Sequence, residues 1–400
     1  MKKLNLYYIG THILFWAGYA IAWSYTAVYL QERGYNSQIV GLVTGIGAVI
    51  SVLLQPLLAQ MIAKNQKMSN LSNVLYLKLL AIVMAVLMLL NLPGVYTVAI
   101  LFTILAGLDA SIPSILNSIA METNNAGGKI NYGFARGMGS IGYALFSVLL
   151  GWAVSSFGAE CLMLLYIGVG ILTIVIVGML KKASDKLIKM PKNAVEQKSG
   201  TDVSMLSLFE KYSFLKYFLL ATVLLFMSHN MVCVFLPMII EHAGGDSSKL
   251  GVALAISAVV EFPVMACFVK LSQKIKIEKL LIISAVFFTV KSTVMFFASG
   301  VALVYLAQFL QFGGFALYIP ASVYFIDMSL QEEDRNVGQA ITGACSLGLG
   351  GTFGNVLGGV LIEGAGLSTM VLVSTVFCAV ALVLMILSKR NYLRHNLKKV

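Results

Sequence analysis

The sequence is poor in charged residues. Only 11% of its 400 residues are Asp, Glu, Lys or Arg, whereas 59% are hydrophobic, and the mean hydropathy is +0.88. Apolar runs of about 20 residues recur along the whole chain, and each is long enough to cross a hydrocarbon core of about 30 Å as a helix. This composition excludes a soluble globular domain and predicts an all-α integral membrane protein.

Cysteine is also scarce, and motifs for metal binding or enzyme chemistry are missing. The five cysteines lie in or at the ends of apolar runs without CxxC or Cys/His spacing, so we interpret them as packing residues and expect no disulfide, metal or cofactor. No DDxxD, HExxH, GxSxG or Walker loop occurs. The chain is therefore not expected to be an enzyme, and a membrane-embedded transferase is only a distant alternative.

The apolar runs predict about twelve transmembrane helices, six on each side of a hydrophilic connection. We place an N-terminal six-helix bundle at 1–180, a cytoplasmic linker at 181–215, and a C-terminal six-helix bundle with a basic tail at 216–400. The linker is rich in lysine and contains Pro191 and Gly200. A short amphipathic helix is expected around Val203–Tyr212.

The net charge of +11 follows from topology. With twelve spans, nearly all basic residues outside the spans fall on the side of the two termini, and only Arg33 and Lys249 fall on the other. The positive-inside rule then predicts cytoplasmic termini and a multi-pass protein of a bacterial-type plasma membrane. A nucleic-acid partner becomes unnecessary, and we expect a monomer in the lipid bilayer. The opening Met-Lys-Lys-Leu is interpreted as part of the first helix, not as a cleaved signal peptide.

The two halves repeat each other at an offset of about 207 residues. Matches occur in the second and eighth, the fourth and tenth, and the fifth and eleventh predicted helices. A common offset predicts a parallel repeat of two six-helix bundles around a central cavity. The clearest pairs are Pro56 with Pro263, Gly107 with Gly314, Pro113 with Pro320, and, one residue short of that offset, Ser140 with Ser346.

The fifth predicted helix opens with an arginine. A guanidinium near the middle of a span costs about 2.5–3.5 kcal/mol on insertion scales, so it favours a wet cavity or an anionic partner. Arg136, Ser140 and Tyr143 are spaced i, i+4 and i+7, which places all three on one helix face. The alternative is that Arg136 extends to the cytoplasmic headgroups from the first helical turn.

The run Tyr132-Gly-x-Ala-Arg136-x-x-Gly-Ser140-x-Gly-Tyr143 resembles the start of helix 5 in the oligosaccharide:proton symporters, the lactose permease-like family of the major facilitator superfamily. The resemblance implies a twelve-helix fold in which Arg136 holds sugar hydroxyls and Tyr143 stacks on the sugar ring. Elsewhere the chain departs from the family. The helix-10 histidine and glutamate that couple protons are replaced by Leu310 and Gly313.

Two opposite charges lie inside adjacent predicted helices of the second half. Glu261 is in helix 8 and Lys291 is in helix 9, and an isolated charge has no cheap location in a span except a cavity or the side of a counter-charge. The resemblance implies that Glu261 binds sugar and that Lys291 occupies the position of a coupling arginine. We expect the two to interact and either one to carry the proton; the alternative is a static structural pair.

The fourth helix carries Asp109, Pro113 and Asn117 at i, i+4 and i+8. The family's helix-4 glutamate falls at Ser118, so Asp109 is the favoured second carboxylate for proton coupling, provided that Pro113 kinks the helix enough to turn it inward. Asn117 is expected in the solute site. Lys78, in the third helix, is expected to extend to the cytoplasmic headgroups.

Three further polar or aromatic patterns are candidates for the site. His229, in helix 7, is a proton-site candidate, although a hydrogen-bonded packing histidine is an equal alternative. In helix 10 a stripe formed by Gln308, Gln311, Phe315 and Tyr318 suits an uncharged polyhydroxy ligand. In helix 1, Tyr19 and Trp23 share a face, for which packing or lipid contact is the favoured interpretation.

These observations predict a secondary active transporter of a small hydroxyl-rich solute, a sugar or oligosaccharide, working by alternating access with proton symport. The predicted substrate-binding residues are Arg136, Ser140, Tyr143, Glu261, Gln311, Tyr318 and Asn117, and the predicted proton-coupling residues are Glu261, Lys291, Asp109 and His229. Alternatives within the same fold are a nucleoside or small aromatic-acid transporter and an efflux carrier.

Overall fold

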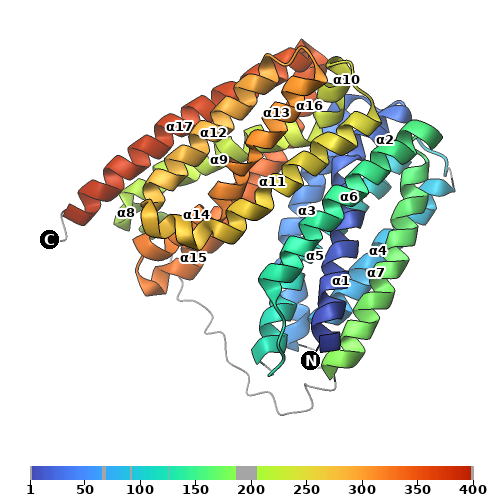
Figure 1. Cartoon of the computed structure of the whole chain (residues 1–400), viewed down its shortest axis with the longest axis horizontal. Helices are drawn as coiled ribbons and strands as arrows, with labels where there is room; N and C mark the ends of the chain where they lie inside the picture. The colour runs from blue at the N-terminus through green and yellow to red at the C-terminus, as the bar shows by residue number, and fades with distance from the viewer. Residues whose placement is uncertain (1, 65–68, 91, 126, 186–204, 398–400) are drawn as a thin grey trace.

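The structure, a computed structural model, describes residues 2–64, 69–90, 92–125, 127–185 and 205–397 (Figure 1). These residues form helices joined by short connections, and no strand occurs among them. Within this described part of the chain, eleven helices are long and apolar enough to cross a membrane, or twelve if the bent pair near its start is counted as one span. The predicted all-α fold with about twelve spans is confirmed.

The helices of the first half are α1 Lys2–Tyr19, the π-helical turn η1 Ala20–Ser24, α2 Thr26–Glu32, α3 Ser37–Lys64, α4 Asn70–Leu89, α5 Thr97–Asn125, α6 Tyr132–Phe157 and α7 Cys161–Asp185. Those of the second half are α8 Met205–Lys211, α9 Ser213–Val234, α10 Leu236–His242, α11 Ser247–Lys274, α12 Ile277–Phe296, α13 Val301–Phe309, the 3₁₀ turn η2 Leu310–Phe312, α14 Phe315–Ser329, α15 Glu332–Gly343, the π-helical turn η3 Ala344–Gly350, α16 Gly351–Ala365 and α17 Leu367–Leu397.

Local sequence signals set several helix ends. The side chains of Ser69, Asn131 and Asp246 accept hydrogen bonds from backbone N–H groups three residues later and so cap the N-termini of α4, α6 and α11. Gly158 and Gly366 follow α6 and α16 with φ of 76° and 88°, a conformation that residues with a Cβ avoid. These capping side chains and glycines therefore mark where the helices begin and end.

Among the described residues, four spans depart from a continuous α-helix, and in the eleventh the π-helical turn η3 separates α15 from α16. The first span bends by 47° between η1 and α2. The seventh span ends at Val234 and restarts as α10, whose second residue is Pro237, which has no N–H to donate. The tenth span is divided by the turn η2 and by Gly313 and Gly314. Such breaks expose backbone groups and re-aim side chains, so they are tolerated mainly where they line a cavity.

Figure 1 shows α1–α7 on one side of the molecule and α9–α17 on the other. The two groups lie close together at the end that contains α2 and α10 and diverge toward the end with the N-terminus, here called the linker face. At the closed end α3 packs on α16, because Gly41 and Gly359 lack side chains; a Cβ on either would collide with a backbone carbonyl of the other helix. Hydrogen bonds cross there from Ser37 N–H to Glu363 Oε1 (2.9 Å) and from Ser248 N–H to Ser155 Oγ (3.1 Å).

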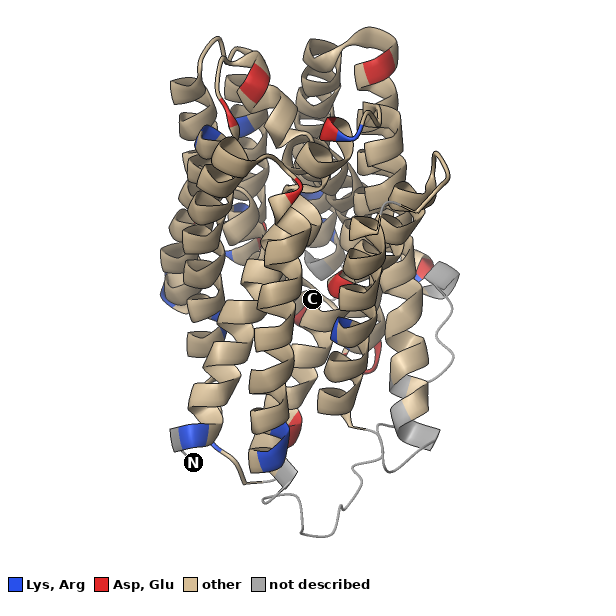
Figure 2. Ribbon diagram, turned by 90° about the vertical axis from the view of Figure 1, so that its right-hand side faces the viewer, with Lys and Arg blue, Asp and Glu red and all other residues tan. Residues whose placement is uncertain are grey.

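The outer surface matches a lipid environment. Large apolar side chains are exposed along the helices, among them Leu145, Trp152 and Leu164 at 63%, 59% and 62%. Figure 2 shows long uncharged stretches of helix between a small number of charged residues. An exposed apolar surface of this extent is tolerated when lipid covers it.

The predicted linker lies only partly within the described residues. Helix α7 continues to Asp185, beyond the predicted boundary at 180, and α8 falls inside the range in which an amphipathic helix was expected. Residues 186–204, with most of the linker lysines, lie outside the described residues. The division of the chain at 181–215 stays a prediction.

Candidate functional site

A cavity of about 440 Å³ lies between the two groups of helices. The first group contributes residues from α1, η1, α3, α5 and α6, and the second contributes residues from α9, α10, α11, α13, η2, α14, η3 and α16. Seven of the predicted site residues line this cavity: Asn117, Arg136, Ser140, Tyr143, His229, Glu261 and Gln311.

Helix α6 supplies the cationic wall. The Arg136 Nη1 donates a hydrogen bond to Ser140 Oγ (3.0 Å), one turn further along α6. The guanidinium lies over the Trp16 ring, with 4.2 Å between the guanidinium carbon and the ring centroid, an arrangement in which the ring face attracts the cation. The predicted shared face is confirmed. Because Arg136 lies in the cavity wall, the headgroup alternative is not what the structure shows.

Tyr143 is held by the first span. Its hydroxyl hydrogen-bonds to Ser24 Oγ at 2.6 Å, and Ser24 is the last residue of the π-helical turn η1. A π-helical turn shifts the register of the following side chains and is common at functional sites. The turn thus brings Ser24 and Tyr143 together at the edge of the cavity.

Helix α11 supplies the anionic wall through Glu261. The Glu261 Oε1 accepts a hydrogen bond from Gln311 Nε2 (3.1 Å), and Gln311 Oε1 accepts one from Lys291 Nζ. Lys291 itself is 5% exposed and is not a lining residue. The ion pairs among the described residues do not include one between Glu261 and Lys291. The two charges are therefore linked through Gln311, which agrees with the expectation that they interact and shows that the link is indirect.

The cavity is electrostatically asymmetric. Arg136 comes from the first group of helices and Glu261 from the second, and within the described residues they form no ion pair with each other. Neutral amides and hydroxyls lie around them, including Gln55, Asn117 and Gln308. Groups of this kind can donate to and accept from a solute that bridges the two halves.

Aromatic rings form much of the remaining wall. Tyr19 and Trp23 stack at a centroid distance of 5.9 Å with 17° between their planes, and on the other side His229 stacks on Phe315 at 4.6 Å and 12°. All four line the cavity. Tyr19 and Trp23 also pack against the buried core, so the preferred interpretation of packing is confirmed, but it is incomplete because both rings face the cavity. The helical spacing of Trp16, Tyr19 and Trp23 did indicate a shared aromatic face. The sequence alone could not show that this face points toward the cavity.

Three predicted site residues lie outside the cavity wall: Lys291, Tyr318 and Asp109. Tyr318 is 1% exposed and hydrogen-bonds to Thr222 inside the second group of helices. The expected contact between Tyr318 and solute is therefore absent from this conformation.

Asp109 did not turn toward the cavity as expected. Its Oδ1 lies 2.7 Å from Lys78 Nζ, and both side chains are 1% exposed. The same Nζ lies 3.2 Å from the Tyr166 hydroxyl. Lys78 was expected to extend to the headgroups, and that expectation was wrong, because burial among α4, α5 and α7 is possible once a carboxylate neutralises the cation.

The described residues contain no group of three or more His, Cys, Asp or Glu side chains arranged to hold a metal ion. The polar groups at the cavity are instead a guanidinium, a carboxylate, amides, hydroxyls and an imidazole. Such a set recognises an organic solute by hydrogen bonding and stacking.

Comparison with known proteins identifies the family and the fold. The profile of the MFS_1 like family matches residues 6–373. The maltose permease of Geobacillus stearothermophilus is 25% identical over 374 residues, which cover 91% of this chain and 90% of that protein.

Solved structures share the fold at low sequence identity. A mutant of the nucleoside transporter NupG superposes with a TM-score of 0.78 at 15% identity, over 97% of this chain and 99% of that one. A bacterial homologue of the iron transporter ferroportin in an inward-facing state superposes with a TM-score of 0.73 at 14% identity, with the same coverage. The family profile spans nearly the whole chain, and the chain therefore belongs to the MFS_1 like family and is a transporter of the major facilitator superfamily.

Proposed function

We propose that the protein is a proton-coupled symporter of a small hydroxyl-rich solute, a sugar or oligosaccharide. The observation that carries this proposal is the cavity in which Arg136 and Glu261 occupy walls from different halves of the chain, with neutral hydrogen-bonding groups and aromatic rings between them. A sugar presents hydroxyls that donate and accept, together with an apolar ring face that stacks on aromatic side chains. The similarity to a maltose permease supports the same substrate class.

Alternating access follows from the placement of the solute between the halves. In the conformation described, hydrogen bonds between the halves join α3 to α16 and α6 to α11 at the end away from the linker face. This arrangement corresponds to a cavity that opens toward the cytoplasm, if both termini are cytoplasmic. A solute that contacts both Arg136 and Glu261 would favour closure of the halves around it.

Proton coupling is assigned to Glu261, with Lys291 as the cation that influences it. Protonation would remove the negative charge from the cavity and alter the balance with Arg136. Asp109 and His229 are further candidates. His229 lines the cavity, while Asp109 forms its ion pair away from it.

Uptake by proteoliposomes tests the proposal. Maltose and other sugars, uridine and benzoate would be added one at a time while labelled-solute uptake and external pH are recorded. Sugar-driven external alkalinisation in wild type, lost in Glu261→Gln, is the expected result. Arg136→Ala at wild-type protein levels should abolish uptake. Sugar uptake without proton movement would overturn the coupling, and full uptake by Arg136→Ala would overturn the site.

The stacked rings favour one second candidate, a nucleoside or small aromatic acid. A planar base or benzoate ring could pack between Tyr19–Trp23 on one wall and His229–Phe315 on the other. Uridine or benzoate uptake without sugar uptake in the same panel would select this candidate.

A further inference from the structure

Gln311 lies between two charged groups and bonds to both, because its amide can accept a hydrogen bond from one and donate a hydrogen bond to the other. Its oxygen accepts from the Lys291 ammonium, and its NH₂ donates to the Glu261 carboxylate. An ammonium can only donate and an ionised carboxylate can only accept, so a reversed amide would lose both hydrogen bonds. The chemistry of the two partners therefore fixes the orientation of Gln311 and aligns its dipole between the charges.

The burial of the three residues makes this link significant. Lys291 and Gln311 are 5% and 4% exposed, whereas Glu261 is partly exposed and lines the cavity. Lys291 cannot contact a solute there, because it lies behind the wall. Hydrogen bonds and charges act more strongly in such a low-dielectric interior than in water.

The backbone at Gln311 ties the link to the shape of the tenth span. Gln311 is the middle residue of the turn η2, immediately before the break at Gly313 and Gly314. Ser284 of α12, the helix that carries Lys291, donates to the Gly314 carbonyl at 2.9 Å. A Cβ at Gly313 would collide with the Phe287 ring, also on α12. The break thus holds Gln311 against α12 and within reach of Glu261.

We propose that Gln311 is a positioning residue that transmits the charge of Lys291 to Glu261, so that a lysine outside the cavity sets the state of the carboxylate inside it. This inference rests on the proposed role of Glu261 in the solute site and adds the means by which that residue is controlled. Straightening of the tenth span would withdraw Gln311 and disconnect the two charges.

Other titratable groups also surround Glu261, and the test must separate them from the link. They come from two further helices packed around the cavity, in addition to Lys291 on α12. The groups are Arg136 and Tyr143 on α6, and His229 and Cys233 on α9.

The experiment is the pH dependence of thermal unfolding of the purified, ligand-free protein in detergent micelles. Comparison of wild type with Glu261→Gln identifies the part of the profile that depends on Glu261. Gln311→Met keeps a side chain of similar length but removes the amide. In this variant we expect the pH midpoint of the Glu261-dependent change in unfolding temperature to move by about one pH unit. Lys291→Met should move this pH midpoint in the same direction. In the double variant the shift should be no larger than the larger of the two single shifts.

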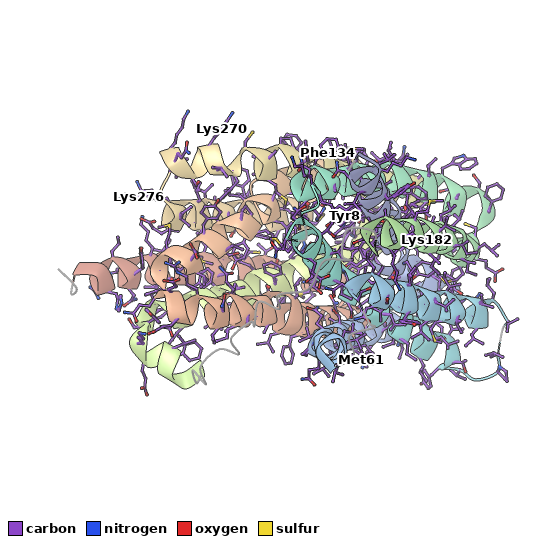
Figure 3. The ribbon with its side chains drawn as sticks, turned by 90° about the horizontal axis from the view of Figure 1, so that it is seen from below. Tyr8, Met61, Phe134, Lys182, Lys270 and Lys276 are labelled. Carbon is purple, nitrogen blue, oxygen red and sulfur yellow. The ribbon has the colours of Figure 1, made fainter. Side chains whose placement is uncertain are left out.

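The controls keep the test decisive. Lys270→Met removes an exposed lysine of α11, which points outward from the molecule in Figure 3, and should leave the midpoint unchanged. If Gln311→Met does not fold, Gln311→Asn serves instead, since its side chain is one methylene too short to reach both charges. The measurement needs no solute for any of these variants.

Three results would overturn the link. The midpoint could move in Lys291→Met but not in Gln311→Met, which would show that the lysine acts through space. The two shifts could add fully in the double variant, which would show independent paths. The wild-type profile could also lack any part that depends on Glu261. That result would overturn the link, because a carboxylate influenced by a buried cation in the folded state should bind protons differently after unfolding. Because no solute is present, failure of the sugar proposal would leave this result standing.

Discussion

Each half of the molecule buries a lysine on its third span, and the two are satisfied in different ways. Lys78 forms a direct ion pair with Asp109 at 2.7 Å, with the Tyr166 hydroxyl at 3.2 Å. Lys291 has a neutral amide, Gln311, as its hydrogen-bond partner. The first arrangement neutralises the cation locally, whereas the second leaves its charge to act on a neighbour.

The difference also concerns access to the cavity. Lys78 and Asp109 are both 1% exposed and neither lines the cavity. Gln311 does line it and reaches Glu261. A buried pair isolated from solvent costs desolvation that its attraction must offset, so breaking it by removing one partner is expensive. The first lysine is therefore expected to stabilise its helix group, whereas the second is proposed to act on the site through Gln311.

The largest expected effect comes from breaking the first pair. Asp109→Asn leaves Lys78 as a buried cation without its counter-charge, so the free energy of unfolding should fall by about 3–5 kcal/mol. Unfolding of the purified protein in micelles measures it. The double variant Lys78→Met, Asp109→Leu removes both charges and should recover most of the loss.

A double variant as unstable as Asp109→Asn would contradict the assignment of this pair to stability. The same folded double variant also tests the proposed proton role of Asp109. If it exchanges labelled solute across the membrane but cannot accumulate it, Asp109 has a role in coupling as well.

The second effect sharpens the contrast at Lys291. Lys291→Met leaves the Gln311 oxygen as a buried acceptor without its donor, which costs about 1–3 kcal/mol. This loss should be smaller than that of Lys78→Met, because no carboxylate is left without its only counter-charge. The same unfolding assay compares the two substitutions. Equal losses would show that Lys291 is also part of a structural pair.

The third effect concerns a single hydrogen bond. Tyr166→Phe removes the hydroxyl that contacts Lys78 but keeps both the ring and the ion pair with Asp109. We expect a loss of about 1 kcal/mol in the free energy of unfolding. A loss as large as that of Asp109→Asn would mean that the hydroxyl, and not the carboxylate, holds the ammonium.

The smallest effect is expected at an exposed lysine. Lys211, just before α9, donates to Asp334 Oδ2 at 2.7 Å, and this hydrogen bond raises the pKa of Lys211 above its usual value. A raised pKa in the folded state means that the stabilisation is complete below the unfolded pKa of about 10.4 and is lost as the pH rises beyond it. In that alkaline range the unfolding temperature of wild type should fall more steeply with pH than that of Lys211→Met. Identical profiles of unfolding temperature against pH would contradict the prediction.

The sequence determined the spans and the face of α6. A bilayer of fixed thickness requires apolar runs of fixed length, so composition alone predicted about twelve helices. The helical period placed Arg136, Ser140 and Tyr143 together because all three belong to one uninterrupted helix. Close to Arg136, the cost of a charge in lipid was enough to predict a cavity.

The tertiary structure decided which polar residues face that cavity. The spacing of Asp109 and Asn117 suggested one polar stripe, but a separation of eight residues turns the helix by about 80° beyond two full turns. Asn117 therefore lines the cavity, whereas Asp109 forms an ion pair with Lys78. In the tenth span, the break at η2 separates Gln311, which faces the cavity, from Tyr318, which does not. The partners of Lys78 and Lys291 come from other helices, so only packing between helices could identify them.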